Sequence, residues 1–600
     1  MNTAEKLQQL RDLMRQHHID AYIIMSADPH MSEYLPEYWK SRQWLSGFDG
    51  SVGTLVVCQD FAGLWVDGRY WLQAEKQLQG SGFQLQKLSH DAKTTHTAWL
   101  AQHLESGARI AVDGQSISIQ HYQALEQVAQ EKSAEICHEL DLIAEIWEDR
   151  PALPVKPVRL TAPGLDACSR SEKIAQIRAA LVEHKVEAHF ISAVDDIAWI
   201  LNCRGQDVEY NPIFLAHLLI TTSIVVLFID RAKLSDAVES ALSLDHIEIV
   251  DYQHSAAYLA TLEHSTILLD PAKVSLLHYR ALANRCQIKF DLNPSTLLKA
   301  QKAATEIAHI RHAMLKDGIA LCQFFSWLDQ VLAQQQALTE LDIDREITAY
   351  RAKQDGFIGL SFATIAGFNA NGALPHYRAT QQHHAHIQGN GLLLIDSGAQ
   401  YLDGTTDITR VVPVGIPTSE QCRDYTLVLK AHIALARAVF PEALAAPLLD
   451  AICRQALWQH GLDYRHGTGH GVGYALNVHE GPQVLSYSAP ITAYSGLRPG
   501  MIVSNEPGLY HSGQYGIRIE NLVVNQIKAF AEQQYGTFLC FETLTLCPIH
   551  QAPIVVELLS QDDIQWLNDY HRKVRQQLAP HLDGAALAWL IQQTQDIAMI

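Results

Sequence analysis

GLLLIDSGAQYLDGTTDITRVV, residues 391–412, decides the fold of the C-terminal half of this 600-residue chain. Two β-rich apolar runs flank a stretch of Gly, Asp and Thr, a pattern that predicts a hairpin. Asp396 ends the first predicted strand, and Asp407 lies in the second, eleven residues later. A minimal two-residue turn would pair residue 396 with residue 411, so placing Asp396 opposite Asp407 requires a longer loop or a bulge. With such a connection, both carboxylates project into one site.

Two further predicted strands carry acidic side chains. IVSNEPG places Glu506 in a strand, and GIRIENLVV places Arg518 and Glu520 two residues apart, on one face of a strand. A carboxylate buried on an apolar strand costs free energy unless it has a partner. One such residue is usually salt-bridged or at a sheet edge, but four in one domain predict a bound cation. Four carboxylates with one histidine form an oxygen-rich site that favours Mn²⁺, with Co²⁺ or Zn²⁺ as substitutes.

The sequence around these strands predicts the fold class of the C-terminal region. Residues 301–332 predict a long helix, and strand patterns predominate after residue 391 with helical segments between them. This mixture predicts an α+β domain around an antiparallel sheet. The chain ends in a predicted packing helix, whose apolar positions are Ile564, Leu567, Tyr570, Val574 and Leu578.

The N-terminal half contains an internal repeat. Residues 10–35 and 177–201 share one plan: an amphipathic helix, a polar break, a β-rich strand, and an Asp-containing turn into another helix. Each is followed by a strand pair, in 54–69 and 217–231. Two tandem α/β domains are therefore predicted, joined by the proline-rich linker RPALPVKPVRLTAP (150–163).

One apolar stretch, residues 213–229, is nearly long enough to span a membrane, which takes about 20 apolar residues. His217 and the polar run 221–223 interrupt it, and β-branched residues are frequent. Two buried strands joined by a polar turn explain it better than a membrane span. The predicted domains are then 1–155, 156–300 and 301–600, with a helical C-terminal extension at about 541–600.

Composition limits the classes of partner. The formal net charge of −20 argues against binding to a nucleic-acid backbone. It is compatible with a cationic ligand such as a peptide ammonium group, although solubility alone explains it more simply. The ten cysteines are scattered without a CxxC, which predicts a reduced, cytoplasmic protein rather than a disulfide scaffold. The polar N-terminal helix has no apolar core of a signal peptide.

The acidic set, together with a glycine- and histidine-rich stretch at 466–480, resembles the pita-bread metallopeptidases, which include methionine aminopeptidase, prolidase and aminopeptidase P. The motif is D-x₁₀-D, H, E, E. Further motifs are similar to the long, three-domain, cytosolic X-Pro aminopeptidase branch, with two creatinase-type N-terminal domains: GFDGSVGTLVV, WVDGRYWLQA, EIAHIRHA, FNANGALPHY, YLDGTTDITR, HGTGHGVGYALNVHEGP, SNEPGLY and FETLTLCPI. The resemblance runs from about residue 5 to the end and is looser in the first two domains.

The resemblance implies a role for each matching residue. It implies two divalent ions held by Asp396, Asp407, His470, Glu506 and Glu520. Glu506 would also accept the proton of the attacking water. His376 and His479 would bind substrate and stabilise the intermediate, with further active-site roles for His466 and Arg518 and substrate binding by Arg69.

The implied activity is release of an N-terminal residue from peptides with proline in the second position, by a homodimer that binds neither nucleic acid nor membrane. Two alternatives stay open: a prolidase that acts on X-Pro dipeptides, and an inactive pita-bread scaffold that binds peptides. The histidine-rich QQHHAH (381–386) is interpreted as a solvated loop, since carboxylates are missing from it. The glycines of 466–473 do not follow a dinucleotide-binding fingerprint.

Overall fold

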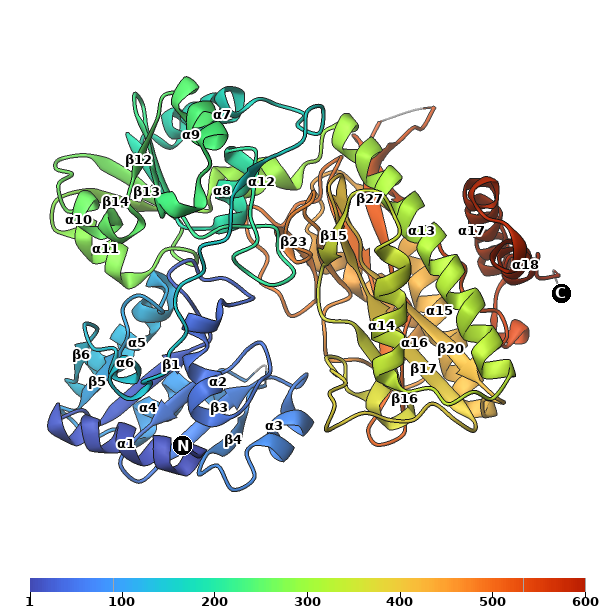
Figure 1. Cartoon of the computed structure of the whole chain (residues 1–600), viewed down its shortest axis with the longest axis horizontal. Coiled ribbons are helices and arrows are strands. Elements are labelled where there is room, and N and C mark those ends of the chain that lie inside the picture. Colours follow the sequence, from blue (N-terminus) through green and yellow to red (C-terminus); the bar gives the residue numbers. More distant parts are fainter. Residues whose placement is uncertain (90, 532–533, 599–600) are drawn as a thin grey trace. The chain divides into compact units, whose positions relative to one another are not determined.

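The computed structural model describes residues 1–89, 91–531 and 534–598 of the chain. It divides into two compact units (Figure 1). The first comprises residues 1–161 and 168–296, and the second comprises 162–167 and 297–600. The predicted boundaries after residues 155 and 300 stay predictions, because the first unit encloses both predicted N-terminal domains.

The first unit contains two six-stranded sheets of identical order. One runs β4-β3-β2-β1-β5-β6, with strands β1 Ala21–Met25, β2 Thr54–Val57, β3 Ala62–Val66, β4 Gln84–Lys87, β5 Arg109–Val112 and β6 Glu135–Cys137. The other runs β12-β11-β10-β8-β13-β14, with strands β8 Ala188–Ile191, β10 His217–Thr221, β11 Val225–Phe228, β12 Ile247–Val250, β13 Thr266–Leu269 and β14 Gln287–Phe290.

The strand directions confirm the internal repeat. In each sheet the first central strand, β1 or β8, pairs antiparallel with one neighbour and parallel with the other. An amphipathic helix precedes it in both copies, α1 Thr3–Gln16 and α7 Arg170–His184. The two copies therefore share their topology as well as their sequence pattern.

The apolar stretch 213–229 forms strands, as predicted. β10 and β11 pair antiparallel, joined by a turn that includes the exposed residues 222–224. Among the described residues, no helix is long and apolar enough to cross a membrane.

The second unit is built on antiparallel strands, as predicted. Its six-stranded sheet runs β21-β28-β27-β24-β22-β23, with strands β21 Val439–Pro441, β22 Gly469–Gly471, β23 Glu480–Leu485, β24 Ile502–Asn505, β27 Asn521–Lys528 and β28 Phe538–Thr543. A three-stranded sheet runs β16-β17-β20, with strands β16 Ile365–Phe368, β17 Gly391–Ser397 and β20 Ile408–Val414. Smaller sheets are formed by β15 Phe357–Leu360, β18 Ala399–Tyr401 and β19 Gly404–Thr405, and by β25 Gly508–His511 with β26 Tyr515–Arg518.

Long helices pack on these sheets around a large hydrophobic core and smaller apolar clusters. The predicted first helix is α13, Ala304–Ala333, and the other helices are α14 Glu340–Arg351, α15 Ser419–Ala436, α16 Asp450–Trp458, α17 Gln561–Leu578 and α18 Gly584–Gln593. Apolar side chains of α13, β17, β20, α15 and α17 join in that core. The apolar stripe predicted for the last long helix is buried in α17. This packing fixes the strands that carry the acidic residues.

Candidate metal centre

The hairpin that carries the first two acidic residues has the longer connection that the sequence required. Asp396 in β17 pairs with Thr409 of β20, and Asp407 lies directly before β20 begins. The intervening chain forms its own short hairpin, β18–β19, in which Tyr401 pairs with Gly404. Asp396 and Asp407 are 7% and 4% exposed, so both carboxylates are buried.

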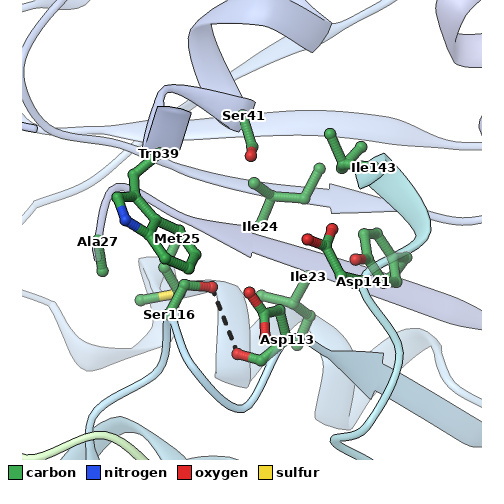
Figure 2. A pocket seen from close by; sticks show the side chains of 11 residues that line it. Ile23, Ile24, Met25, Ala27, Trp39, Ser41, Asp113, Ser116, Asp141 and Ile143 are labelled. Atoms are coloured by element: carbon green, nitrogen blue, oxygen red, sulfur yellow. Dashed lines mark hydrogen bonds between the residues drawn. The ribbon is translucent and has the colours of Figure 1, made fainter. Parts of the chain in front are cut away.

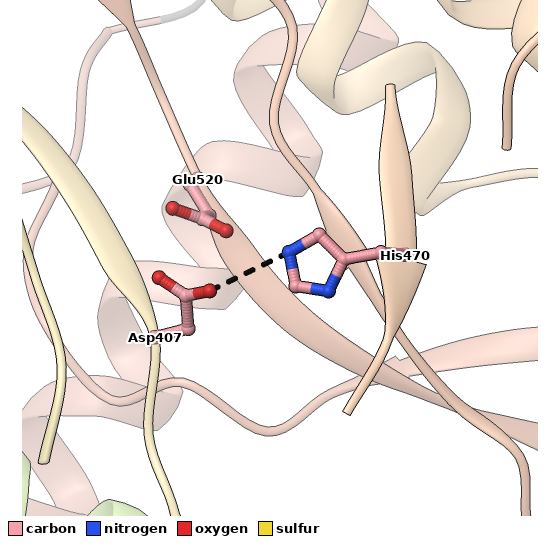
Figure 3. Close-up of side chains that lie close together, drawn as sticks. All are labelled: Asp407, His470 and Glu520. Atoms are coloured by element: carbon pink, nitrogen blue, oxygen red, sulfur yellow. Dashed lines mark ion pairs between the residues drawn. The ribbon is translucent and has the colours of Figure 1, made fainter. Parts of the chain in front are cut away.

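A histidine from the other sheet meets this hairpin. His470 lies in β22, and its Nε2 is 3.6 Å from Asp407 Oδ2 and 3.5 Å from Glu506 Oε1. Asp407, His470 and Glu520 offer ligand atoms that all lie within 4.8 Å of one another (Figure 3). Ser504 links the set, since it accepts from the His470 backbone N–H at 3.0 Å and donates to Glu506 Oε1 at 3.2 Å.

The prediction that Arg518 and Glu520 share one face of a strand is wrong. Arg518 is the last residue of β26, and Glu520 lies in the break before β27, where the chain passes from the small hairpin into the six-stranded sheet. Both side chains still reach the site. Arg518 forms an ion pair with Asp396, and Glu520 Oε2 accepts a hydrogen bond from Thr409 Oγ1 at 2.8 Å.

The acidic cluster carries unfavourable charge in the absence of a cation. Burial, and then the neighbouring carboxylates, raise the pKa of Asp407 and of Glu520 well above the ordinary values. Burial raises the pKa of Glu506 to about 7, although the Arg518 guanidinium acts in the opposite direction. Asp396 Oδ1 is buried and has no hydrogen-bond partner among the described residues. An unpaired buried oxygen amid carboxylates whose pKa values are raised fits a site whose ligands hold metal ions.

Two predicted active-site histidines have contacts at the centre. The rings of His470 and His479 meet edge to face, with centroids 4.3 Å apart. His466 Nε2 lies 2.8 Å from the hydroxyl of Tyr510, which also accepts from Arg518 Nη1 at 2.6 Å. Sequence reasoning assigned no role to Tyr510, although it lies in the motif SNEPGLY.

The contacts of Pro375, the residue before His376, show where His376 lies. The carbonyl of Pro375 accepts a hydrogen bond from Arg518 Nη2 at 3.4 Å, and the same guanidinium pairs with Asp396. The predicted substrate histidine therefore follows a residue that contacts the metal centre's own arginine.

A second acidic pair occurs in the first unit but lacks the features of this centre. Asp113 and Asp141 line a cavity of about 10 Å³ beside Trp39 and Ser116 (Figure 2). Burial, and then the Asp141 charge, raise the pKa of Asp113 to about 7. Space for about one water and no third ligating side chain in the described part of the chain make this a buried polar pocket, not a metal centre.

Comparison with known proteins matches every part of the chain. Family models for the creatinase/prolidase N-terminal domain match residues 6–145 and 149–306. The model for metallopeptidase family M24 matches residues 308–526, and that for its C-terminal region matches 537–597.

Relatives that match over nearly the full length of the chain identify its family more specifically. The chain is 39% identical to a probable Xaa-Pro aminopeptidase P of Laccaria bicolor, over 98% of this chain and 93% of the relative. It is 38% identical to aminopeptidase P2 of Arabidopsis thaliana, over 99% and 88%. The chain belongs to the Xaa-Pro aminopeptidase P family. The crystal structure of an X-prolyl aminopeptidase from Caenorhabditis elegans, described as a cytosolic enzyme with a di-nuclear active site, superposes with a TM-score of 0.95 at 33% identity, covering all of both chains.

In this member of the aminopeptidase P family, a buried arginine connects the region of the acidic cluster to the C-terminal region. Arg410, in β20, is 1% exposed. It donates to the carbonyls of Thr409 and Glu520 at 2.9 and 2.6 Å, and to those of Cys547 and Pro548 at 2.8 and 2.9 Å. Sequence reasoning missed it, although a lone arginine in the apolar run TRVVPV was the available signal.

Arg69, predicted to bind substrate, lies in the first unit. Its guanidinium forms a two-point ion pair with Asp67, at 2.9 and 2.7 Å. Its substrate role stays a prediction.

Proposed function

We propose that this chain is a dimetal aminopeptidase that releases the N-terminal residue of peptides whose second residue is proline. The observation that carries the proposal is the cluster of buried carboxylates around His470, in a chain with full-length Xaa-Pro aminopeptidase relatives. An X-Pro bond is a tertiary amide without an N–H, so a peptidase for it must act through the carbonyl and the departing nitrogen.

Five side chains would hold the ions: Asp396, Asp407, His470, Glu506 and Glu520. The oxygen-rich donor set supports Mn²⁺, with Co²⁺ and Zn²⁺ as substitutes. Two divalent ions bound there would lower the pKa of water and polarise the scissile carbonyl.

The remaining roles belong to the protein's own groups. Glu506 accepts the proton of the attacking water, and the Ser504 hydroxyl orients its carboxylate. Arg518 balances the charge of Asp396 and holds Tyr510, which in turn orients His466. His376 and His479 bind the substrate around its carbonyl and stabilise the charge that develops there.

The deciding experiment compares three substrates on metal-stripped protein resupplied with Mn²⁺: X-Pro, X-Pro-Pro and X-Ala-Pro. We expect release of X from X-Pro-Pro and little from X-Ala-Pro. Cleavage confined to X-Pro would identify a prolidase instead. Failure to cleave any of them, with no transition ion bound to the purified protein, would identify a peptide-binding scaffold.

The same metal-stripped protein tests which ion the enzyme uses. Metal analysis after loading with Mn²⁺, Co²⁺ or Zn²⁺ should find two ions per chain, and Mn²⁺ should give the highest activity. A higher activity with either substitute would overturn the assignment of Mn²⁺.

We also propose that the enzyme is a cytoplasmic homodimer. Ten cysteine thiols without a disulfide support a reducing compartment. Exposed apolar side chains support a second copy as partner, since Trp458, Tyr487 and Ile491 are 44%, 50% and 61% exposed. Light scattering that gives the mass of one chain would refute the dimer.

A further inference from the structure

Glu340 is a buried carboxylate that the metal centre does not use. It is the first residue of α14, is 0% exposed, and follows the helix-capping residue Thr339. The positive end of a helix dipole favours a negative charge at this position. The groups that donate hydrogen bonds to Glu340 indicate its role.

Its donors come from both ends of one loop. Oε1 accepts from the backbone N–H of Phe368 at 2.7 Å and from Asn371 Nδ2 at 3.0 Å. Oε2 accepts from the hydroxyl of Tyr377 and from the backbone N–H of Ala385, both at 2.7 Å. A single carboxylate thus closes the segment 368–385 on itself.

Charge makes this closure strong. The donors are neutral groups, and hydrogen bonds to an ionised acceptor are about twice as strong as those between neutral groups. Burial, and then the bond to Glu340, raise the pKa of Tyr377 well above its ordinary value, so the phenol remains a donor. Backbone contacts add to the closure: Glu340 N–H donates to the Ala385 carbonyl at 3.2 Å, and Thr339 forms a β-bridge with His386.

The loop contains His376 between two residues that are held from opposite sides. Tyr377, directly after it, is bound to Glu340, and Pro375, directly before it, accepts from Arg518 of the metal centre. A histidine flanked by two fixed neighbours has little freedom in its Cα position. The histidine-rich tract at 381–386 belongs to the same closed loop. Through the backbone N–H of Ala385 it anchors the loop to Glu340, rather than forming a metal site.

We propose that Glu340 is a positioning residue that sets the reach of His376 into the substrate site. The inference rests on the proposed function, because it takes His376 as a substrate-binding group. Glu340 itself touches neither substrate nor metal ligands. It acts by holding Tyr377 and Ala385 in place.

The kinetic test uses the Mn²⁺-loaded enzyme with X-Pro-Pro and compares E340Q with E346Q. Both substitutions turn a glutamate of α14 into glutamine, but Glu346 is a partly exposed partner of Arg345. In E340Q, the side-chain NH₂ group is itself a donor, so it cannot accept the hydrogen bonds that one oxygen of Glu340 accepts. We expect E340Q to lower kcat/KM by at least about tenfold through a higher KM, with two ions still bound, and E346Q to stay within about twofold of wild type.

A double-mutant cycle separates positioning from general damage. In an H376A background, E340Q should change kcat/KM by less than about twofold, because the group that Glu340 positions is gone. The same loss in both backgrounds, or a lower metal content in E340Q, would overturn the proposal.

A second measurement does not depend on activity. Hydrogen exchange of peptides covering 368–386 should be faster in E340Q than in E346Q, because the glutamine amide keeps only one accepting oxygen and either Phe368 or Ala385 loses its acceptor. If X-Pro-Pro is not cleaved at all, the proposed function fails while this comparison still tests the closure. Should E340Q not fold, Y377F removes one donor and should show a smaller change in KM and exchange; unchanged values in Y377F would refute the role of Glu340.

Discussion

At the scale of single residues, the metal centre is incomplete without its ions. One oxygen of Asp396 pairs with Arg518, and the other is buried without a hydrogen-bond partner among the described residues. Leaving a buried acceptor unsatisfied costs about 1–3 kcal/mol. Asp407 and Glu520 add mutual repulsion in a buried setting. The second unit should therefore gain stability from bound cations.

Metal removal should lower the stability of the second unit. Ions present at about 100 times their dissociation constant stabilise a protein by about 2.7 kcal/mol, and a chelator removes that contribution. Differential scanning calorimetry with and without chelator measures the shift. The D407N variant, with a weakened site, should respond less; an equal shift in D407N would place the ions elsewhere.

Replacing Glu506 with glutamine should remove proton transfer. The amide keeps the size of the side chain but accepts no proton, so kcat should fall by about 10²–10⁴-fold. Steady-state kinetics on X-Pro-Pro provides the measurement. The control is E442Q, at an exposed glutamate of the same unit, which should retain wild-type activity. A kcat for E506Q within about threefold of wild type would exclude Glu506 as the base.

The sequence predicts the ligands but not all of the residues that support them. Asp396, Asp407, Glu506 and Glu520 are acidic residues in apolar strand contexts, an anomaly that is visible without a structure. Glu340 is the first residue of a helix, directly after an ordinary capping residue, and its four donors lie 28 to 45 positions away. A pattern of neighbours along the chain cannot contain such contacts, because they exist only after the loop has folded.

At the scale of elements, the hairpin of β17 and β20 illustrates the same limit. Hydrophobic runs predicted both strands, but the sequence left the register open: a minimal turn would pair residue 396 with residue 411, and a longer connection was needed to place Asp396 opposite Asp407. The actual register, Asp396 opposite Thr409, depends on the extra hairpin β18–β19, which joins a different sheet through β15. Likewise, the strand predicted through Arg518 and Glu520 is broken because β26 and β27 belong to different sheets.

Arg410 should prove essential for the junction between β20, β27 and the C-terminal region. Methionine at this position fills part of the volume but leaves buried carbonyls of Glu520, Cys547 and Pro548 without their donor. We expect R410M to lower the free energy of unfolding by about 3 kcal/mol or more, with weaker metal binding, since Glu520 loses its backbone anchor. Urea unfolding and metal titration measure both effects.

The control for R410M is R437M, which removes an exposed arginine paired with Asp562. A surface ion pair of this kind contributes about 0–1 kcal/mol, so this variant should unfold near wild type. Equal destabilisation by the two substitutions would contradict a special role for Arg410.

At the scale of the whole molecule, both units bury histidines, and the second unit also buries the acidic cluster. The first unit buries three imidazoles in contact: the ring centroid of His217 lies 4.4 Å from that of His30 in a stacked pair and 4.3 Å from that of His278 in a tilted pair. Burial lowers the pKa of all three, to about 3 for His278. The second unit buries acids whose pKa values are raised, together with three histidines whose pKa values burial lowers to about 3: His432, His550 and His571.

In the metal-free protein, the buried histidines and the acidic cluster should therefore have opposite effects on stability as the pH changes. Lowered histidine pKa values favour the folded state above about pH 6.5, and that stability is lost as the pH falls below it. A raised glutamate pKa has the opposite sign: stability is present below the unfolded value of about 4.5 and is lost as the pH rises through about 7. Between about pH 7.5 and 5, acidification should destabilise the fold through the buried histidines and stabilise it through Glu506. Calorimetry on chelator-treated protein measures both contributions: H217F should reduce the loss of thermal stability on acidification, and E506Q should enlarge it. The same pH dependence in the two variants would refute this assignment.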